Sequence, residues 1–174
     1  MKVGNYEFEI KNFKYLETRS EETNCFSAVL YVNGKKAADC GNSGHGGSTD
    51  IYFFPSCEQM EREIEDFLKT QPKIKYERYE FDLTLEYIVD SLVEECLNAK
   101  FLKKWMKKAG KYLLFRNPQG TYYQISWKKY TVDALLKTQP GRDMIQNTIA
   151  IHINKGNVLL NENIPSDLLP DKKQ

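Results

Sequence analysis

The sequence predicts an α+β fold in which most strands pair antiparallel. Segments that alternate apolar and polar residues fill the first fifty residues, two long segments with helical spacing of apolar residues follow, and shorter strand-like segments come after them. Strands and helices grouped in separate runs are typical of this class. With 174 residues, 41% of them hydrophobic, the chain is long enough for one sizeable core. We expect one domain over residues 1–160 and a polar, loosely held tail over residues 161–174.

The first fifty residues predict an antiparallel hairpin preceded by another strand. Apolar residues alternate with charged ones over residues 6–11, which is typical of a half-buried strand. A second alternating segment, residues 26–32, ends at Asn33-Gly34, a dipeptide that favours a type I′ turn because both residues tolerate a positive φ. Residues 35–40 are therefore expected to form the returning strand. A short apolar strand at residues 51–54 is stopped by Pro55.

Two longer helices are expected at about residues 56–70 and 84–109, joined by a connector. Ser56 is the predicted N-cap of the first, with Gln59 in the position of a capping box. The second carries one long apolar stripe, begins at Thr84 and ends at Gly110. It is acidic at its start and rich in lysine at its end, which suits the helix macrodipole.

The C-terminal third predicts a β-hairpin, a short helix and a last strand. The elements are expected in this order: strands at residues 112–115 and 121–127 around a turn at 117–120, a helix that Thr131 caps and that ends before Pro140-Gly141, and a strand at residues 148–153. His152 falls in that last strand on the face opposite the isoleucines, so we expect it to face solvent.

Charge is distributed unevenly along the chain, although the net charge is only +1. Residues 50–99 contain thirteen acids and five bases, whereas residues 100–142 contain eleven bases and one acid, Asp133. Such asymmetry is typical either of a surface that meets a polyanion or of two elements that pair with each other in the fold. The lysine-rich helix end has a third explanation, since cations stabilise a helix C-terminus.

Aromatic residues are interleaved with these bases. Cations that neutralise phosphates, together with rings on which bases stack, are what a protein needs to hold single-stranded nucleic acid. The candidate binding residues are Lys100, Lys103, Lys104, Lys107, Lys108, Lys111, Arg116, Lys128, Lys129, Trp105, Tyr122, Tyr123 and Trp127. Trp105 lies on the apolar stripe, where a core position is expected, and one of Tyr122 and Tyr123 must face outward in a regular strand.

The second distinctive segment is the glycine-rich loop at residues 41–50. Its candidate recognition residues are Asn42, Gly44, His45, Gly46, Gly47 and Ser48. Closely spaced glycines let backbone amides converge on an anion or let another surface approach. The spacing fits neither the phosphate-loop nor the dinucleotide pattern, and no Gly-x-Ser-x-Gly elbow accompanies it. We expect a structural or recognition loop and assign no catalytic residue; chemistry by His45 and Ser48 is the alternative.

No metal, other cofactor or membrane segment is expected. Cys25, Cys40 and Cys57, with His45, are ligand types that zinc accepts, but the short two-to-four-residue knuckle is missing. With Cys96 they are expected to be free thiols. No apolar run approaches the length of a membrane helix, so we expect a soluble, cytoplasmic protein.

Residues 5–60 resemble a family of small bacteriophage and prophage accessory proteins. The resemblance is carried by Ser20-Glu21-Glu22-Thr23, Cys25-Phe26, Val32-Asn33-Gly34-Lys35 and Asn42-Ser43-Gly44-His45-Gly46-Gly47. Family members often carry Asp at the position of Ser43 and Cys at that of Ser48, and these departures weaken a metal or catalytic role for the loop. The family has no established enzyme activity. The resemblance implies an accessory protein of a mobile element, for which inhibition of host defence is a common task.

Together these observations lead to one main functional hypothesis and two alternatives. We expect a non-enzymatic protein that binds RNA, or a host RNA-protein effector complex, and blocks its use, as an anti-CRISPR protein does. In the first alternative, the acidic segment at residues 58–95 imitates nucleic acid and binds a host protein. In the second, the loop from Gly41 to Asp50 builds a small hydrolase or nucleotide-binding protein.

Overall fold

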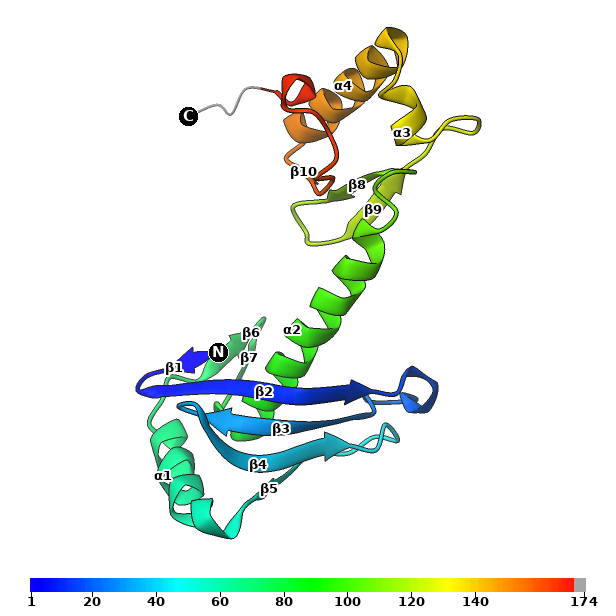
Figure 1. Cartoon of the computed structure of the whole chain (residues 1–174). Coiled ribbons are helices and arrows are strands. Elements are labelled where there is room, and N and C mark those ends of the chain that lie inside the picture. Colours follow the sequence, from blue (N-terminus) through cyan, green and yellow to red (C-terminus); the bar gives the residue numbers. More distant parts are fainter. Residues whose placement is uncertain (171–174) are drawn as a thin grey trace. The chain divides into compact units, whose positions relative to one another are not determined.

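The chain divides into two compact units, Met1–Asn98 and the part from Ala99 onward, where the sequence predicted one domain. The structure is a computed structural model and describes residues 1–170 (Figure 1). It confirms the α+β class: antiparallel sheets and several helices are present. Helix α2, Leu85–Met106, contributes its first half to the first unit and its last residues to the second.

The first unit is built on a five-stranded antiparallel sheet in the order β1-β2-β3-β4-β5 (Figure 1). The strands are β1 Lys2–Val3, β2 Tyr6–Tyr15, β3 Phe26–Val32, β4 Lys35–Asn42 and β5 Asp50–Phe53. The predicted turn between β3 and β4 is confirmed, because Asn33 and Gly34 have φ values of 50° and 77°. A 3₁₀ turn, Glu17–Arg19, lies between β2 and β3.

Two helices bury their apolar faces on one side of this sheet. Helix α1 is Glu58–Lys69 and packs Ile64 and Leu68 against the strands, and the first half of α2 adds Ile88, Val89 and Val93. The predicted Ser56 cap is wrong. A 3₁₀ turn, Pro55–Cys57, precedes α1, Cys57 occupies the N-cap position, and no side chain caps the helix. Because Pro55 starts that turn, Ser56 is held one residue too early to accept from the first amides of α1.

The connector between the two helices contains an additional β-hairpin that the sequence analysis missed. Strands β6, Ile74–Tyr76, and β7, Tyr79–Phe81, form a separate two-stranded sheet. Except for Ile74 its strand residues are exposed, and Lys75 and Glu80 pair across it at 3.1 Å. The hairpin contacts α2 through the Phe81 and Tyr87 rings, whose centroids are 5.7 Å apart.

The second unit packs helices on a three-stranded antiparallel sheet in the order β10-β8-β9. The strands are β8 Leu113–Arg116, β9 Tyr122–Ile125 and β10 Val158–Leu159, and the helices are α3 Val132–Leu135 and α4 Gln139–Asn154. The core combines Leu113 and Phe115 from β8 with Ile145 and Ile149 from α4. The predicted cap is confirmed, since the Thr131 hydroxyl accepts from the Ala134 amide of α3.

The predicted final strand at residues 148–153 is wrong, because these residues belong to α4. Pro140-Gly141 does not end a helix there but lies in the first turn of α4, which Thr138 caps. Proline suits a first turn because its missing N–H has no intrahelical partner there. Ile145 and Ile149 are both fully buried at a spacing of four residues, whereas Ile151 is 54% exposed. Helical burial of the first pair therefore outweighs the alternation at residues 149–153.

The segment after β10 is packed over the part that the structure describes. Asn161, Ile164 and Leu168 are 4–9% exposed, and a 3₁₀ turn spans Ser166–Leu168. Residues 161–170, which the sequence predicted to be a loosely held tail, thus contribute to the core of the second unit; positions 171–174 of that tail lie outside the described residues. Over residues 1–170 no helix is both long and apolar enough to cross a membrane.

Candidate functional site

Three aromatic side chains of the second unit form a partly exposed cluster. The rings of Phe101 and Trp105 stack at a centroid distance of 5.7 Å and an interplanar angle of 26°. Tyr122 packs against both, at 5.7 Å from each ring. Phe101 is 46% exposed, and the other two are half-buried. We call Phe101, Trp105 and Tyr122 the ring cluster; it offers flat apolar surface to a ligand.

The strand register places a cation beside the ring cluster. Arg116 is opposite Tyr122 in the β8–β9 pair, and Val158 is opposite Arg116 in the β10–β8 pair. Side chains of directly opposed residues lie on the same face of a sheet. Arg116 and Tyr122 are therefore neighbours on one face, while Phe115 and Tyr123 lie on the other, under α4. Arg116 is exposed, so its guanidinium is available next to the rings.

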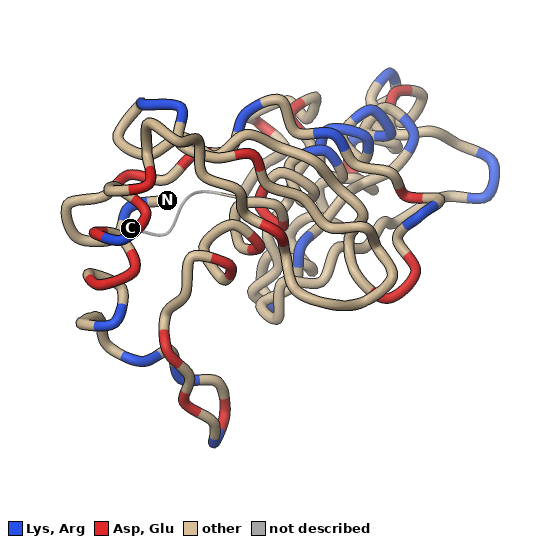
Figure 2. The backbone as a smooth tube through the Cα atoms, turned by 90° about the horizontal axis from the view of Figure 1, so that it is seen from below, with Lys and Arg blue, Asp and Glu red and all other residues tan. Residues whose placement is uncertain are grey.

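Helix geometry divides the lysines of α2 into two groups. A helix turns about 100° per residue, so Lys104 lies roughly 100° from Trp105 and toward Phe101, whereas Lys103 lies roughly 160° away on the opposite side. Both are exposed, as are Lys100, Lys107, Lys108 and Lys111. Within the described residues no salt bridge involves Lys103, Lys104, Lys107 or Lys108. Figure 2 shows closely spaced basic residues (blue) along this part of the backbone.

Two of the predicted stacking rings lie elsewhere. Tyr123 faces the core, where its ring stacks on Phe115 at 5.6 Å and its hydroxyl is 2.8 Å from Nδ1 of His152. Trp127 is half-buried against the same core, at the base of a tight turn closed by its bridge to Tyr130. Lys128 and Lys129 are exposed at the tip of that turn. The structure thus brings Trp105, Tyr122 and Arg116 together and separates Tyr123 and Trp127 from them.

His152 is a half-buried helical residue and not the solvent-facing strand residue that the sequence predicted. Its ring lies 4.9 Å from the Phe115 ring and contacts Tyr123. Burial, helped by the charge of Lys155, lowers the pKa of His152 from its usual value. Burial also raises the pKa of Tyr123. The imidazole is therefore held in its neutral form within the second unit.

Acidification is expected to destabilise this unit through His152. Because the folded-state pKa is lowered, the unfolded chain binds the proton more tightly, and stability is lost as pH falls through the unfolded value of about 6.5. Urea unfolding followed by tryptophan fluorescence reports this unit, which contains both tryptophans. We expect the wild type to be less stable at pH 5.5 than at pH 7.5, and the difference to shrink in His152→Phe. Equal pH dependence in the two proteins would contradict this role.

The glycine loop of the first unit is organised by one buried side chain. The Oδ1 atom of Asn42 accepts from the Gly44 amide at 2.9 Å and from the Thr23 hydroxyl at 2.7 Å. Its Nδ2 donates to the carbonyls of Gly47 and Ser48. The Gly44 carbonyl in turn accepts from the amides of residues 21–23. These bonds tie the glycine loop to residues 21–23, which lie between β2 and β3.

Carboxylates surround the same loop. The Glu21 carboxylate lies 3.3 Å from Nδ1 of His45, and Glu22 lies against Gly46. Glu86 of α2 accepts from the Thr49 amide at 2.9 Å, and Asp90 accepts from the Thr49 hydroxyl at 2.6 Å. Because four acids already face these loop atoms, the loop is a poor site for a phosphate or another anion.

The cysteines do not assemble a metal site in the described part of the chain. No group of three or more His, Cys, Asp or Glu side chains is placed to hold a metal ion between residues 1 and 170. Cys25, Cys40 and Cys57 are buried free thiols. Burial, with smaller contributions from Asp39 and Asp90, raises the pKa of Cys40 to about 11, which makes it a weak nucleophile at neutral pH.

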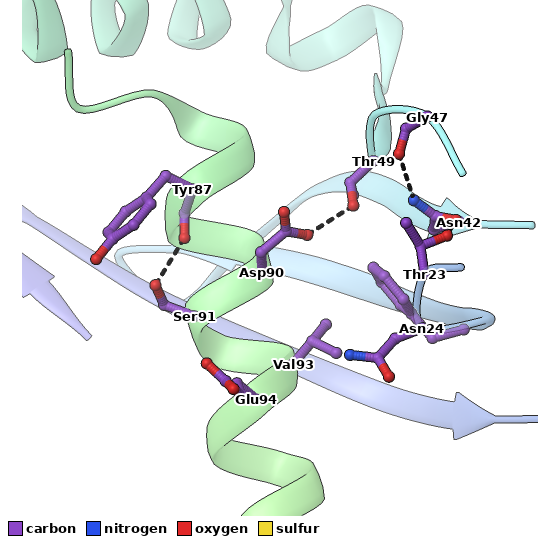
Figure 3. Close-up of a pocket in the computed structure, with 11 residues that line it drawn as sticks. Thr23, Asn24, Asn42, Gly47, Thr49, Tyr87, Asp90, Ser91, Val93 and Glu94 are labelled. Carbon is purple, nitrogen blue, oxygen red and sulfur yellow. Dashed lines mark hydrogen bonds between the residues drawn. The ribbon is translucent and has the colours of Figure 1, made fainter. Parts of the chain in front are cut away.

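A polar pocket of about 320 Å³ lies between the glycine loop and α2 (Figure 3). Asp90 and Glu94 of α2 line it together with Asn24 and Thr49 from the loops, and Asp90 points toward Thr49. Partial burial, and then the charge of Glu86, raise the pKa of Asp90, while the bond from Thr49 opposes the shift. The pocket is therefore acidic and does not fit nucleic acid. Sequence reasoning missed it because Thr49 and Asp90 are far apart in the chain.

No protein-family model, curated protein or solved structure was found to match the chain. What defines the protein is thus its own fold and sites. It is an α+β protein with a ring cluster flanked by cations in one unit and a carboxylate-lined glycine loop in the other.

Proposed function

We propose that this chain is a non-enzymatic RNA-binding protein that holds single-stranded RNA, free or within an RNA-protein complex, on the surface of its second unit. The observation that carries the proposal is the ring cluster with Arg116 on the same sheet face. Stacking of a base on an exposed aromatic ring contributes about 1–3 kcal/mol and tolerates any base. Arg116 and Lys104 provide cations at the edge of the rings for the phosphates that link such bases.

The self-pairing explanation of the charge asymmetry receives no support from the ion pairs. The salt bridges in the described chain that involve residues 50–99 join residues of that segment to one another, as in Lys73–Asp82 and Lys75–Glu80. Among the described residues, none of these salt bridges involves Lys103 or Lys104 of α2. Cations left without an acid are available to a polyanion.

A binding role without catalysis fits the chemistry of the glycine loop. His45 contacts the Glu21 carboxylate, and within the described residues no hydrogen bond joins it to a hydroxyl or thiol nucleophile. The Gly44 and Thr49 amides donate to Asn42 and Glu86 instead of facing an open anion site. The proposed biological setting, inhibition of an RNA-guided host defence complex, comes from the phage-protein resemblance of residues 5–60 alone.

Binding to a fluorescent single-stranded RNA tests this proposal. At about 0.15 M salt, where electrostatic screening acts over about 8 Å, Lys104→Glu is expected to weaken binding about tenfold. Lys103→Glu makes the same charge change one residue away, on the side of α2 opposite the rings, and is expected to weaken binding no more than about threefold. Phe101→Ala, which removes an exposed ring, should cost about 1–3 kcal/mol, or roughly 5- to 150-fold.

The salt dependence supplies an independent check. The slope of log K against log salt should become shallower by about 0.7 for each phosphate contact that a lysine or arginine variant removes. Absence of RNA binding at about 50 mM salt, or equal effects of Lys103→Glu and Lys104→Glu, would refute the proposed surface. The defence role is tested separately by plasmid interference in cells that carry an RNA-guided system, with Lys104→Glu as the inactive variant.

A further inference from the structure

Strand β5 is an edge strand whose outer hydrogen-bonding groups are free of ladder partners. It is the last strand of the five-stranded sheet (Figure 1) and pairs only with β4. The Phe54 amide donates to the Ala37 carbonyl opposite it, so alternation assigns Tyr52 and Asp50 to the inner hydrogen-bonded positions. The amides and carbonyls of Ile51 and Phe53 therefore point away from β4.

The amide of Thr49 also points outward along this edge, and it already has a hydrogen-bond partner in a side chain. Thr49 precedes β5, and its amide donates to Glu86 of α2 at 2.9 Å. Beyond the ladder, no backbone or side-chain hydrogen bond in the described chain reaches Ile51 or Phe53. The backbone groups of Ile51 and Phe53 thus present the donor and acceptor pattern that an added strand needs.

A groove runs along this edge between β5, α1 and the start of α2. Two adjoining hollows of about 500 and 540 Å³ share Ile51, Phe53 and Glu61. The floor of the 500 Å³ hollow is apolar and consists of Ile51, Phe53, Leu68, Leu83 and Leu85. These two hollows together are called the β5 groove. Its floor offers apolar area next to the free backbone groups.

The rim of the β5 groove is mainly acidic. Glu58, Glu61 and Glu65 of α1 line it, as do Asp82 and Glu86 on the other side. Of the two cations on the rim, Lys69 is paired with Asp66 at 2.9 Å, and Arg62 donates to the Glu58 carbonyl. The rim therefore attracts a positively charged partner.

On the opposite side of the sheet, β1 pairs only with Tyr6 and Glu7 of β2, so the rest of β2 forms an edge, and this edge shows how pairing is prevented. On β2, the register shifts between Lys11 and Lys14, and Asn12 has a φ of 54°. Bulges and lysines are the usual devices that prevent an edge from taking up another strand. Strand β5 has a regular register with β4 and no lysine, so it lacks both devices.

We propose that β5 is a docking site for an extended, basic segment of a partner protein, which adds to the sheet as a sixth strand. Alternate residues of that segment face the β5 groove. Lysine or arginine stems there cover the apolar floor, and their charged ends reach Glu61 and Glu65. The intervening residues are apolar and lie beside Tyr52, which is 69% exposed. A second copy of β5 fits less well because two acidic rims would repel each other. This site is separate from the proposed RNA surface.

A peptide of alternating lysine and valine, seven residues long and fluorescently labelled, serves as the probe. We expect measurable anisotropy binding to the wild type. A peptide of identical sequence and charge, N-methylated at alternate amides so that one edge cannot donate, should bind at least tenfold more weakly. Ile51→Pro should also cost at least tenfold, because proline removes an outward amide while leaving the inner ladder to β4 intact.

Charge reversal on α1 tests the rim with a matched control. Glu61→Lys with Glu65→Lys should weaken the lysine peptide at least tenfold, whereas Glu63→Lys, on the same helix but outside the groove, should change binding less than about twofold. Equal binding of the methylated and unmethylated peptides would overturn the proposal. So would an equal loss of peptide affinity in Glu63→Lys and in the double variant Glu61→Lys with Glu65→Lys. So would sedimentation showing a dimer that Ile51→Pro dissociates, since the occupant would then be a second copy. RNA binding should be unchanged in all these variants.

Discussion

Replacing Gly44 with alanine is expected to unfold most of the first unit, at a cost of more than about 3 kcal/mol. Gly44 has a φ of 90°, which alanine rarely adopts. A Cβ atom there would collide with the Arg19 carbonyl and come within 2.8 Å of the Cys25 side chain. Because the Gly44 carbonyl also accepts from three amides, moving the loop away would leave those donors without their partner.

Gly47→Ala is the matched control in the same loop. Gly47 has a φ of 94°, but a Cβ atom would meet nothing within 4 Å. Only the backbone conformation opposes the substitution, so we expect a loss of about 1 kcal/mol. Two measurements compare Gly44→Ala with Gly47→Ala. Circular dichroism monitors their unfolding in urea, and a thiol reagent reports how accessible the buried thiols of Cys25 and Cys40 become. Similar losses for both variants would show that the packing around Gly44 is unimportant.

Asn161→Ala is expected to destabilise the second unit by about 2–4 kcal/mol. Its Oδ1 atom accepts from the Leu114 amide at 2.6 Å. Its Nδ2 atom donates to the Ala109 carbonyl at 3.0 Å and to the Tyr112 carbonyl at 2.9 Å. Asn161 thus joins the turn after α2 to the central strand β8, and its removal leaves a buried amide unpaired.

Asn163→Ala controls for this effect. The Asn163 side chain is exposed, although it also reaches the Ala109 carbonyl and the Asp133 carboxylate. Because water replaces its bonds readily, we expect a loss of no more than about 0.5 kcal/mol. Tryptophan fluorescence during urea unfolding measures both variants. If Asn161→Ala is as stable as Asn163→Ala, residues 161–170 do not stabilise the unit.

Features of the fold set by a few adjacent residues were predictable from the sequence. The Asn33-Gly34 turn and the Thr131 cap each depend on local backbone preferences, and both are confirmed. The strand prediction at residues 148–153 failed because isoleucines at positions 145, 149, 151 and 153 satisfy a helical and an alternating pattern together. Only the packing of Ile145 and Ile149 under β8 decides between them.

The candidate site was predictable in chemistry but not in geometry. The composition of residues 100–142 indicated rings and cations, and the spacing of Phe101 and Trp105 by four residues already placed both on one side of a helix. Which of Tyr122 and Tyr123 joins them depends on the register of β8 and β9, since a shift by one residue would exchange their faces. The pocket beside Thr49 depends on contacts between residues about 40 positions apart, which no local pattern reveals.

The β6–β7 hairpin has a consequence for how this protein tolerates change in length. It pairs with no other sheet, and its turn residues, Glu77 and Arg78, are exposed. A two-stranded sheet contributes little stability by itself, and neither core depends on its strand residues. During evolution, residues can therefore be inserted or deleted at this tip with little cost to folding, and an engineer can attach a fluorescent or affinity module there.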